Sequence, residues 1–322
     1  MNISLKTGKR WIGKNSGGGK TPDSKKVENL NFRKLTLDDI DRLWQYFVKN
    51  QCRICDCTIG GTFMWRDFFN TEYAIENGHL YLKVKYLTNQ TAFTPPRGDF
   101  PEEDLSKIIE YCKGMNIPPV LCAVSESRMN EIKERFPSSS VYTDRAWSDY
   151  LYSAEDIVNL AGRRFSGQRN HINKFRKEYE NWSFKPITDE NRAEVHSFFG
   201  EFDVENVKES EAYNEGNVKS LEVLDNMEKY RQFGGALYVD GHVVGASIGE
   251  TVGDTMYVHI EKSKKNIHGS YPMLMNQFAK AFVTDRILYI NREEDDGVEG
   301  LRTSKLSYHP KTLLDKYVIE IR

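Results

Sequence analysis

Two short turn signals, one in each half of the chain, constrain its fold more than any other sequence feature. Asn77-Gly78 and Asp240-Gly241 each separate two alternating apolar segments, and a His follows the Gly both times. Asn-Gly and Asp-Gly favour the two-residue turns that connect antiparallel strands. Each hairpin also comes after a helical segment and before a helix and a further strand. The sequence therefore predicts two copies of one fold.

The periodicity of apolar residues predicts a mixed α/β chain, with an antiparallel meander in its second half. Helices are expected at 38–49, 63–69, 102–112, 128–136, 163–179, 191–202, 218–233 and 270–283. Strands are expected at 32–35, 73–75, 80–84, 120–124, 236–239, 243–250, 255–261, 287–291 and 317–321, with a strand-like run ending at 152. We therefore predict two domains, 30–152 and 153–322, after a flexible basic extension at 1–29.

The composition excludes several classes of protein. Of the 322 residues, 39% are hydrophobic, so the chain can bury a large core and is neither disordered nor fibrous. A balance of 45 Lys plus Arg against 47 Asp plus Glu gives a net charge of -2, with no general attraction to nucleic acid or anionic membrane. Apolar stretches are much shorter than the roughly 20 residues that cross a bilayer, and the N-terminus carries no secretory signal. We expect a soluble, cytoplasmic protein without a transmembrane segment.

The five cysteines are too few and too scattered for a disulfide scaffold. Three of them form the cluster Cys52-x-x-Cys55-x-Cys57. A zinc site needs a fourth Cys or His at ligand spacing, and none lies nearby in the sequence. We therefore interpret the cluster as buried thiols, with a zinc or redox role as the less favoured alternative, and we predict no metal site.

The segment 160–177 is the strongest concentration of positive charge, with six cations and no carboxylate. Flexible Gly residues and amide donors interrupt its charges, a pattern that suits contact with phosphate groups. The alternative is a solvated helix face. The candidate phosphate-binding residues are Arg164, Gln168, Arg169, Asn170 and Lys174.

A second candidate anion site precedes the predicted helix at 270–283. Asn266, Gly269, Ser270 and Tyr271 lie where backbone N–H groups of a helix start point outward unpaired. Gly269 would allow a phosphate to approach closely, and Pro272 suits a first helical turn. The same residues also make an ordinary helix start. No Walker, dinucleotide-binding, serine hydrolase or zinc protease motif accompanies them.

The third concentration of polar residues follows the strand that ends at Asn291. Four consecutive carboxylates, Glu293 to Asp296, are followed by Arg302 and Lys305. Such a set at a strand end is typical of sites in open α/β sheets, the alternative being an acidic surface loop. Four adjacent carboxylates cannot all be buried without partners. We predict that Asp295 pairs with Arg302 or Lys305, while Glu293 faces solvent.

Three segments, 164–175, 268–272 and 291–310, resemble the C-terminal domain family of phosphatidylglycerol lysyltransferase. The aromatic segment 62–68 is similar to a helix in the first half of that family, and the match covers most of the chain after residue 30. The resemblance implies two tandem domains of the GCN5-related N-acetyltransferase type, with mixed, mostly antiparallel sheets flanked by helices. It also implies kinship with enzymes that move an aminoacyl group from aminoacyl-tRNA to an amine or hydroxyl. Of the acyl-CoA signature of ordinary acetyltransferases, only the central Gly269 is kept.

These observations lead to an acyl- or aminoacyltransferase with its cleft in the second domain. Glu261 and Asp295 are candidates for the base, and Arg302 and Lys305 for groups that hold phosphate or oxyanion charge. Asn291 is a further candidate for substrate binding. Aminoacyl-tRNA is the expected donor and partner, with a small-molecule, lipid or peptide acceptor. The alternatives are an acyl-CoA-dependent N-acyltransferase and a non-catalytic binding module on the same fold.

Overall fold

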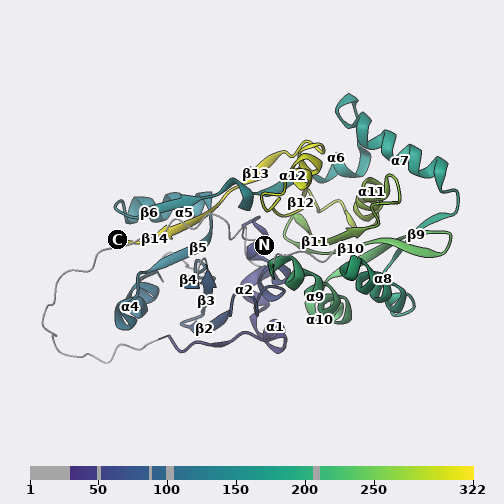
Figure 1. Ribbon diagram of the computed structural model, residues 1–322. Coiled ribbons are helices and arrows are strands. Elements are labelled where there is room, and N and C mark those ends of the chain that lie inside the picture. The colour runs from purple at the N-terminus through teal and green to yellow at the C-terminus, as the bar shows by residue number, and fades with distance from the viewer. Residues whose placement is uncertain (1–29, 49–51, 87–88, 99–104, 206–210) are drawn as a thin grey trace, which may run out of the picture.

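The computed structural model describes residues 30–48, 52–86, 89–98, 105–205 and 211–322, and the predicted extension at 1–29 lies outside them. Within these residues two 7-stranded sheets lie side by side, each flanked by helices (Figure 1). Both sheets are mixed and mostly antiparallel, as the sequence predicts.

The first sheet contains one strand from the far end of the chain. Its strands are β1 (Arg33–Lys34), β2 (Glu72–Glu76), β3 (His79–Tyr86), β4 (Gln90–Phe93), β5 (Val120–Ser125), β6 (Ser140–Thr143) and β14 (Lys316–Glu320). The accompanying α-helices are α1 (Ile40–Leu43), α2 (Gln45–Val48), α3 (Ile59–Phe63), α4 (Leu105–Met115) and α5 (Glu126–Arg135).

The second sheet likewise contains one strand from the first half. Its strands are β7 (Asp149–Ser153), β8 (Trp182–Pro186), β9 (Phe233–Val239), β10 (His242–Val252), β11 (Thr255–Ser263), β12 (Tyr289–Asn291) and β13 (Thr312–Leu314). The accompanying α-helices are α6 (Ala154–Asn159), α7 (Ser166–Glu178), α8 (Arg192–Glu205), α9 (Glu211–Asp225), α10 (Met227–Tyr230), α11 (Ser270–Phe282) and α12 (Glu299–Leu306).

The two sheets have the same layout and exchange one strand each. Their orders are β1-β2-β3-β4-β5-β14-β6 and β8-β9-β10-β11-β12-β7-β13, and the fourth and fifth strands are parallel in both. In each sheet the sixth strand comes from the other half. The sheets therefore do not divide at residues 152 and 153, because the short link Asp315 carries the chain from β13 directly into β14 of the other sheet.

Both predicted hairpins are present and have the backbone conformation that their turn residues favour. Asn77 and Gly78 have φ of 49° and 79°, and Asp240 and Gly241 have φ of 50° and 80°. Positive φ at both central residues is the type I′ geometry, which matches the twist of the flanking strands. The turns thus connect β2 with β3 and β9 with β10.

The helix predicted at 63–69 lies earlier in the chain. It is α3, and the Thr58 hydroxyl accepts a hydrogen bond from the backbone N–H of Gly61 at its start. Residues 64–70 form turns instead, so that Trp65 and Phe69 pack into the core separately from the helix. The predicted bounds were wrong because they rested on the spacing of the aromatic residues, whereas the Thr58 cap determines where the helix begins.

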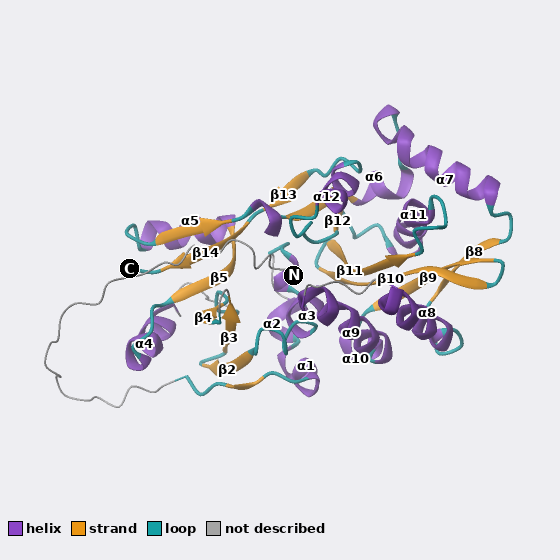
Figure 2. Cartoon of the chain, viewed as in Figure 1, coloured by secondary structure: helices purple, strands orange, loops and turns teal. Residues whose placement is uncertain are grey.

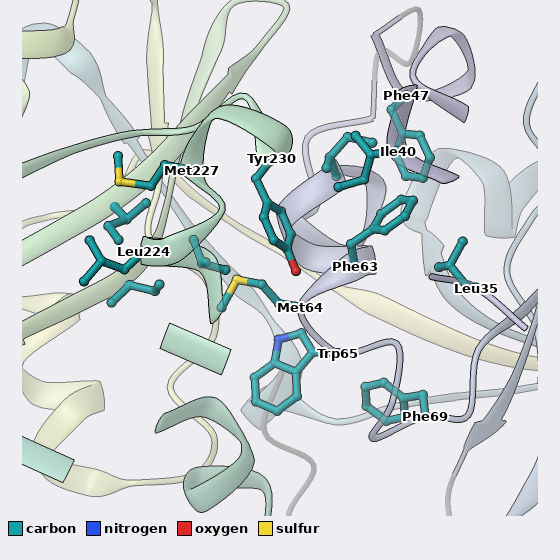
Figure 3. Packing of buried hydrophobic residues seen from close by; sticks show 14 of the residues in the cluster. Leu35, Ile40, Phe47, Phe63, Met64, Trp65, Phe69, Leu224, Met227 and Tyr230 are labelled. Atoms are coloured by element: carbon teal, nitrogen blue, oxygen red, sulfur yellow. The ribbon is translucent and has the colours of Figure 1, made fainter. Parts of the chain in front are cut away.

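One hydrophobic core is common to both halves. It combines Leu80 and Leu82 of β3 with Phe199 of α8 and Ile248 of β10. Figure 3 shows Tyr230 of α10 projecting between Leu224 and Met227 on one side and Ile40 and Phe63 on the other. The packing at this interface is therefore continuous rather than a contact between two closed domains.

Helices cover the outer faces of the sheets as well. In the second sheet, α11 contacts β9 and β10 together with α6 and α7, while α8 contacts β10 from the opposite side (Figure 2). In the first sheet, Leu121 and Ile319 pack with residues of α4 and α5 in a separate core. Each sheet is thus buried on both faces.

We expect the exchanged strand β14 to be essential for stability. Ile319 is fully buried, and its replacement by Ala should lower the free energy of unfolding by about 2–5 kcal/mol. Because each sheet holds a strand of the other half, urea unfolding should remain one transition by circular dichroism and by tryptophan fluorescence. Val141→Ala, at the exposed partner of Ile319 on β6, is the control and should cost much less. Two separate transitions would contradict interdependent sheets.

Candidate functional site

The loop after β12 is tied down by four consecutive charged residues that point in different directions. Each of them makes an ion pair with a different residue, and two of these partners lie on β11. The pairs are Arg292 with Glu261 at 2.9 Å, Glu293 with His259 at 2.7 Å, Glu294 with Lys316 at 2.9 Å and Asp295 with Arg302 at 2.8 Å. The acidic run is therefore a structural junction and not a solvated loop.

The predicted pair of Asp295 with Arg302 is confirmed. Asp295 is fully buried and also accepts hydrogen bonds from Tyr150 at 2.6 Å and Arg145 at 3.2 Å. Burial raises the pKa of Asp295, but the hydrogen bonds from Arg302 and Tyr150 outweigh this effect. The pKa of Asp295 therefore lies below its usual value. A carboxylate held in this way is a weak base. It anchors the loop to α12.

The prediction that Glu293 faces solvent is wrong. Its backbone has a φ of 56°, in the left-handed region, and this turn directs the side chain inward to His259. Lys305 does not pair with Asp295 either. Its buried ammonium group donates to the carbonyl oxygens of Arg292 and Glu294, both at 2.5 Å. Lys305 therefore holds the loop backbone in place.

A second buried group, unforeseen from the sequence, lies beside this loop. The His259 ring bonds through Nε2 to Glu250 at 2.8 Å and through Nδ1 to Glu293 at 2.7 Å. Burial lowers the pKa of His259, but the two glutamates outweigh it and raise the pKa to about 9. Glu250 also accepts a hydrogen bond from the backbone N–H of Gly60 at 2.5 Å. The alternation of His259 and Glu261 on an otherwise apolar strand was the available sequence signal.

A third group surrounds the first residue of the exchanged strand β14. The Lys316 ammonium lies 2.7 Å from Asp149, 2.8 Å from Asp56 and 2.9 Å from Glu294, and donates to the Cys55 sulfur at 3.2 Å. Cys55, Asp149 and Glu294 have the spacing of metal ligands. The Lys316 ammonium, however, takes the place that an ion would need at that point. Lys316 thus joins its own strand β14 to the segment of Cys55 and Asp56, to Asp149 and to Glu294.

The carboxylates around Lys316 differ in their affinity for protons. Burial raises the pKa of Asp149 to about 7, although Lys316 opposes this shift. Burial also raises the pKa of Glu294, but the Lys316 charge outweighs this effect. The pKa of Glu294 is therefore well below its usual value. Asn291, a predicted substrate-binding residue, is buried here and donates to Asp149 at 2.9 Å and to the carbonyl oxygen of Arg53 at 2.7 Å.

A cavity of about 960 Å³ lies between the two sheets and reaches this cluster at Asp56. β4 and β5 share the register pair Phe93 with Leu121 and then diverge, and residues 94–97 of one strand end and Ala123 and Ser125 of the other line the cavity. The other lining residues come from 52–54 and 56–57, from α5, from Leu151 of β7, from Tyr289 of β12 and from 311–315. The strand exchange therefore builds one cavity from both halves.

The cavity has a mixed charge and several donors. Its cationic residues are Arg53, Arg97, Arg128 and Lys311, and its carboxylates are Asp56, Glu126, Glu131 and Asp315. Arg53 is held by Asp254 at 2.7 Å and lies over the ring of Tyr289. In the first turn of α5, from Glu126 to Arg128, the backbone N–H groups have no carbonyl partner within the helix. Together these groups suit a polar ligand.

Glu261, Asp295, Arg302 and Lys305, the four predicted catalytic residues, do not line this cavity. The basic segment also has structural partners. Arg164 pairs with Asp156, Arg169 donates to the carbonyl oxygens of Leu160 and Gly162, and Gln168 donates to Ser307. Asn170 and Lys174 are exposed on α7.

The predicted anion loop before α11 is shaped by packing. A Cβ on Gly269 would lie 2.5 Å from the carbonyl oxygen of His171, so the close approach at this glycine is to the backbone of α7. Ser270 is buried and donates to the carbonyl oxygen of Lys264 at 3.0 Å. Tyr271 is half-buried and Asn266 is exposed.

Comparison with known proteins agrees with the predicted resemblance. A family model described as phosphatidylglycerol lysyltransferase, C-terminal, matches residues 52–320. A solved structure of a conserved protein of unknown function from Bacteroides thetaiotaomicron is 31% identical, covers 91% of this chain and 100% of its own, and has a TM-score of 0.85. A curated protein from Mycoplasmoides gallisepticum is 24% identical over 179 residues, 54% of this chain. The match spans only 56% of that protein.

Two more distant structures show the same fold. The C-terminal domain of a protein described as a lysylphosphatidylglycerol synthetase, from Agrobacterium fabrum, is 11% identical over 88% of this chain and 91% of its own, with a TM-score of 0.62. The L-PGS structure from Bacillus licheniformis is also 11% identical, over 87% and 91%, with a TM-score of 0.59. The predicted architecture of two mixed, mostly antiparallel sheets flanked by helices is confirmed. In the described residues no helix has the length and apolar character to cross a membrane.

We expect the buried His259 to make stability depend on pH. The folded protein holds this proton with a pKa of about 9 instead of 6.5, so the stabilisation is complete below pH 6.5 and is lost as the pH rises toward 9. The difference corresponds to about 3 kcal/mol. Urea unfolding of the wild type should therefore weaken between pH 6 and 9 by about this amount more than that of His259→Gln. Equal pH profiles would contradict a protonated His259.

Loss of the buried Lys316 charge should be strongly destabilising. Lys316→Met leaves three buried carboxylates without their cation, which should cost about 3–5 kcal/mol. Lys311→Met, at the exposed wall of the same cavity, is the matched control and should change the free energy of unfolding by less than about 1 kcal/mol. Thermal unfolding of both variants measures the difference. Equal stabilities would show that the ion cluster contributes nothing.

Proposed function

Because this chain belongs to the phosphatidylglycerol lysyltransferase C-terminal family, we propose that it is an acyltransferase that uses the cavity between its two sheets. Membership of this family supports an acyltransferase, because the transfer of a lysyl group is an acyl transfer. The finer proposal is transfer of an aminoacyl group from aminoacyl-tRNA to an amine or hydroxyl acceptor. The acceptor is a small molecule, a lipid headgroup or a peptide.

The observation that carries the proposal is the cavity at the strand exchange. Its volume of about 960 Å³ exceeds what a single amino acid needs and accommodates an activated ester together with an acceptor group. The N–H groups in the first turn of α5 and the Arg97 side chain supply donors at its walls. Such donors stabilise the oxyanion of a tetrahedral acyl-transfer intermediate.

We assign proton transfer to the carboxylates under the cavity. Asp56 lines the cavity, and the Lys316 ammonium links it to Asp149. With a pKa of about 7, Asp149 exchanges its proton near neutral pH. In this proposal the Asp56 carboxylate receives the proton of the attacking amine or hydroxyl and becomes neutral, while Lys316 stays paired with Asp149 and Glu294. The predicted catalytic residues Asp295, Arg302 and Lys305 act as positioning residues for the loop that carries Glu294.

The exposed basic face of α7 supports tRNA as the donor. Lys174, Arg176 and Lys177 are exposed there, and Arg163 is exposed in the short 3-10 helix Arg163–Phe165 just before it. The segment 160–177 contains no carboxylate. Exposed cations on one helix suit the regularly spaced phosphates of a nucleic acid, and such contacts weaken as salt increases.

Ligand binding tests the choice of donor. We expect aminoacyl-tRNA to raise the melting temperature of the protein, since a ligand that binds only the folded state stabilises it. The shift should decrease between 50 and 200 mM salt, and in Lys174→Ala with Arg176→Ala. A shift with acyl-CoA alone would favour the acyl-CoA-dependent N-acyltransferase. No shift with either class would favour the binding module.

Transfer of radiolabelled amino acids from tRNA to a panel of amines, phosphatidylglycerol vesicles and short peptides tests the chemistry. Asp56→Asn should lower the rate by about 10²- to 10⁴-fold, the usual contribution of a general base, and leave tRNA binding intact. Glu134→Gln, on the exposed side of α5, is the control and should transfer at the wild-type rate. Full activity of Asp56→Asn would refute the assigned role.

A further inference from the structure

The strand β13 lies at the edge of its sheet, and its main chain borders the cavity. Within the described residues β7 is its one strand neighbour, so the other side of β13 pairs with no strand. All five residues of 311–315 line the cavity. Side chains alternate between the two faces of a strand. An unbroken series of lining residues therefore places the strand edge, with its main-chain donors and acceptors, at the cavity wall.

A second strand edge borders the same cavity at another point. In the described residues β5 pairs with β4 at one register position, Phe93 with Leu121, and Ala123 and Ser125 beyond it line the cavity. Ala123 has a φ of 51°, in the left-handed region, and the register between β5 and β14 shifts beside it. Such a bulge leaves main-chain groups without a ladder partner. The cavity thus offers main-chain hydrogen-bonding groups as well as side chains.

The two ends of the segment 311–315 carry opposite charges. The exposed Lys311 places its ammonium 4.9 Å from the ring centre of Tyr289, and the half-buried Asp315 accepts a hydrogen bond from Ser148 at 2.6 Å. In the part of the chain that the structure describes, neither Lys311 nor Asp315 has an ion-pair partner. Four steps along a strand separate them by about 13 Å. Both charges are therefore available to a ligand that lies along β13.

We propose that β13 binds a short peptide as an added strand, with the peptide's N-terminal amine at Asp315 and its C-terminal carboxylate at Lys311. The peptide then runs antiparallel to β13, and about four extended residues span the two charges. An extended peptide supplies the alternating N–H and C=O groups that a strand edge requires. Main-chain pairing of this kind gives affinity, and the charges at the two ends determine the direction of the peptide.

The amine end of the peptide lies beside the carboxylate assigned to proton transfer. Lys316 directly follows Asp315, and its ammonium contacts Asp56 at 2.8 Å. Asp56 and Asp315 also both line the cavity. The peptide is therefore placed as the acceptor of the acyl group, and this part of the inference rests on the proposed function.

The transfer balances as an ester aminolysis. The peptide ammonium first releases one proton to solvent, and its neutral nitrogen then attacks the ester carbonyl carbon of aminoacyl-tRNA. The new C–N bond forms and the C–O bond to the ribose breaks. Asp56 takes the second amine proton and passes it to the ribose oxygen. The products are a peptide that is one residue longer and free tRNA.

Isothermal titration calorimetry of the full-length protein with tetraalanine tests the binding. Acetylation of the peptide amine or amidation of its carboxylate should weaken binding by about three- to tenfold, because each removes one charge. Asp315→Asn should bind the free and acetylated peptides equally, and Lys311→Met the free and amidated ones. Lys280→Met, exposed on α11, is the matched control and should keep both preferences. Circular dichroism confirms that each variant is folded.

Methylation of peptide nitrogens tests the main-chain pairing. Alternate N–H groups of a strand point toward the same neighbour. Tetraalanine methylated on the nitrogen of its third residue should therefore differ from tetraalanine methylated on the second and fourth. One of the two should bind at least about tenfold more weakly than tetraalanine, and the other about equally. Equal effects of the two patterns would contradict an added strand.

The inference and the proposed function can fail separately. No binding, or the same affinity for free and blocked peptides, would overturn the inference, even where vesicles or other amines accept the aminoacyl group. End preferences that persist in Asp315→Asn and Lys311→Met would overturn it as well. Binding with the expected preferences, but no aminoacylated tetraalanine by mass spectrometry after addition of aminoacyl-tRNAs, would support the peptide site and refute transfer to it. Transfer to tetraalanine and not to its acetylated form would support both.

Discussion

The exchange of strands between the two sheets depends on one buried positive charge. Lys316 begins the exchanged strand β14, and Asp149 begins the reciprocal strand β7, and the two residues form an ion pair of 2.7 Å. Both charges are fully removed from water, where an unpaired charge is very costly. Asp56 from the first half and Glu294 from the second complete the group. The cluster therefore defines where each chain segment crosses from one sheet to the other.

The loop 292–295 shows how a run of charges can specify a structure. Its residues contact four separate partners, so a shift of the loop by one position would leave several buried charges unpaired. The left-handed backbone at Glu293 lets neighbouring side chains of the loop point in different directions. Lys305 holds the loop backbone by donating to its carbonyl oxygens. An apolar loop of the same length would tolerate such a shift more easily. The ion pairs thus contribute a unique geometry as well as stability.

The sequence predicted the local features of this fold well and the long-range ones poorly. The hairpins follow from Asn77-Gly78 and Asp240-Gly241, because their turn chemistry is local. The pair of Asp295 with Arg302 could be predicted too, since the two residues are only seven positions apart. The partners of Glu293 and of Lys316 were not, because a strand pattern gives no information on which sheet a strand joins. The strand exchange accordingly escaped prediction, and with it the cavity that it builds.

The same constraint bears on how two copies of one fold diverge. Because each sheet needs a strand from the other half, neither copy can be lost or replaced while the other stays folded. One copy can then lose its catalytic residues and still be required for the other copy to fold. In the second half, Arg292 and Glu293 fill the space where β11 and β12 diverge, whereas the corresponding divergence of β4 and β5 in the first half opens into the cavity. The half with the denser polar motifs in its sequence is therefore the one that uses them for structure.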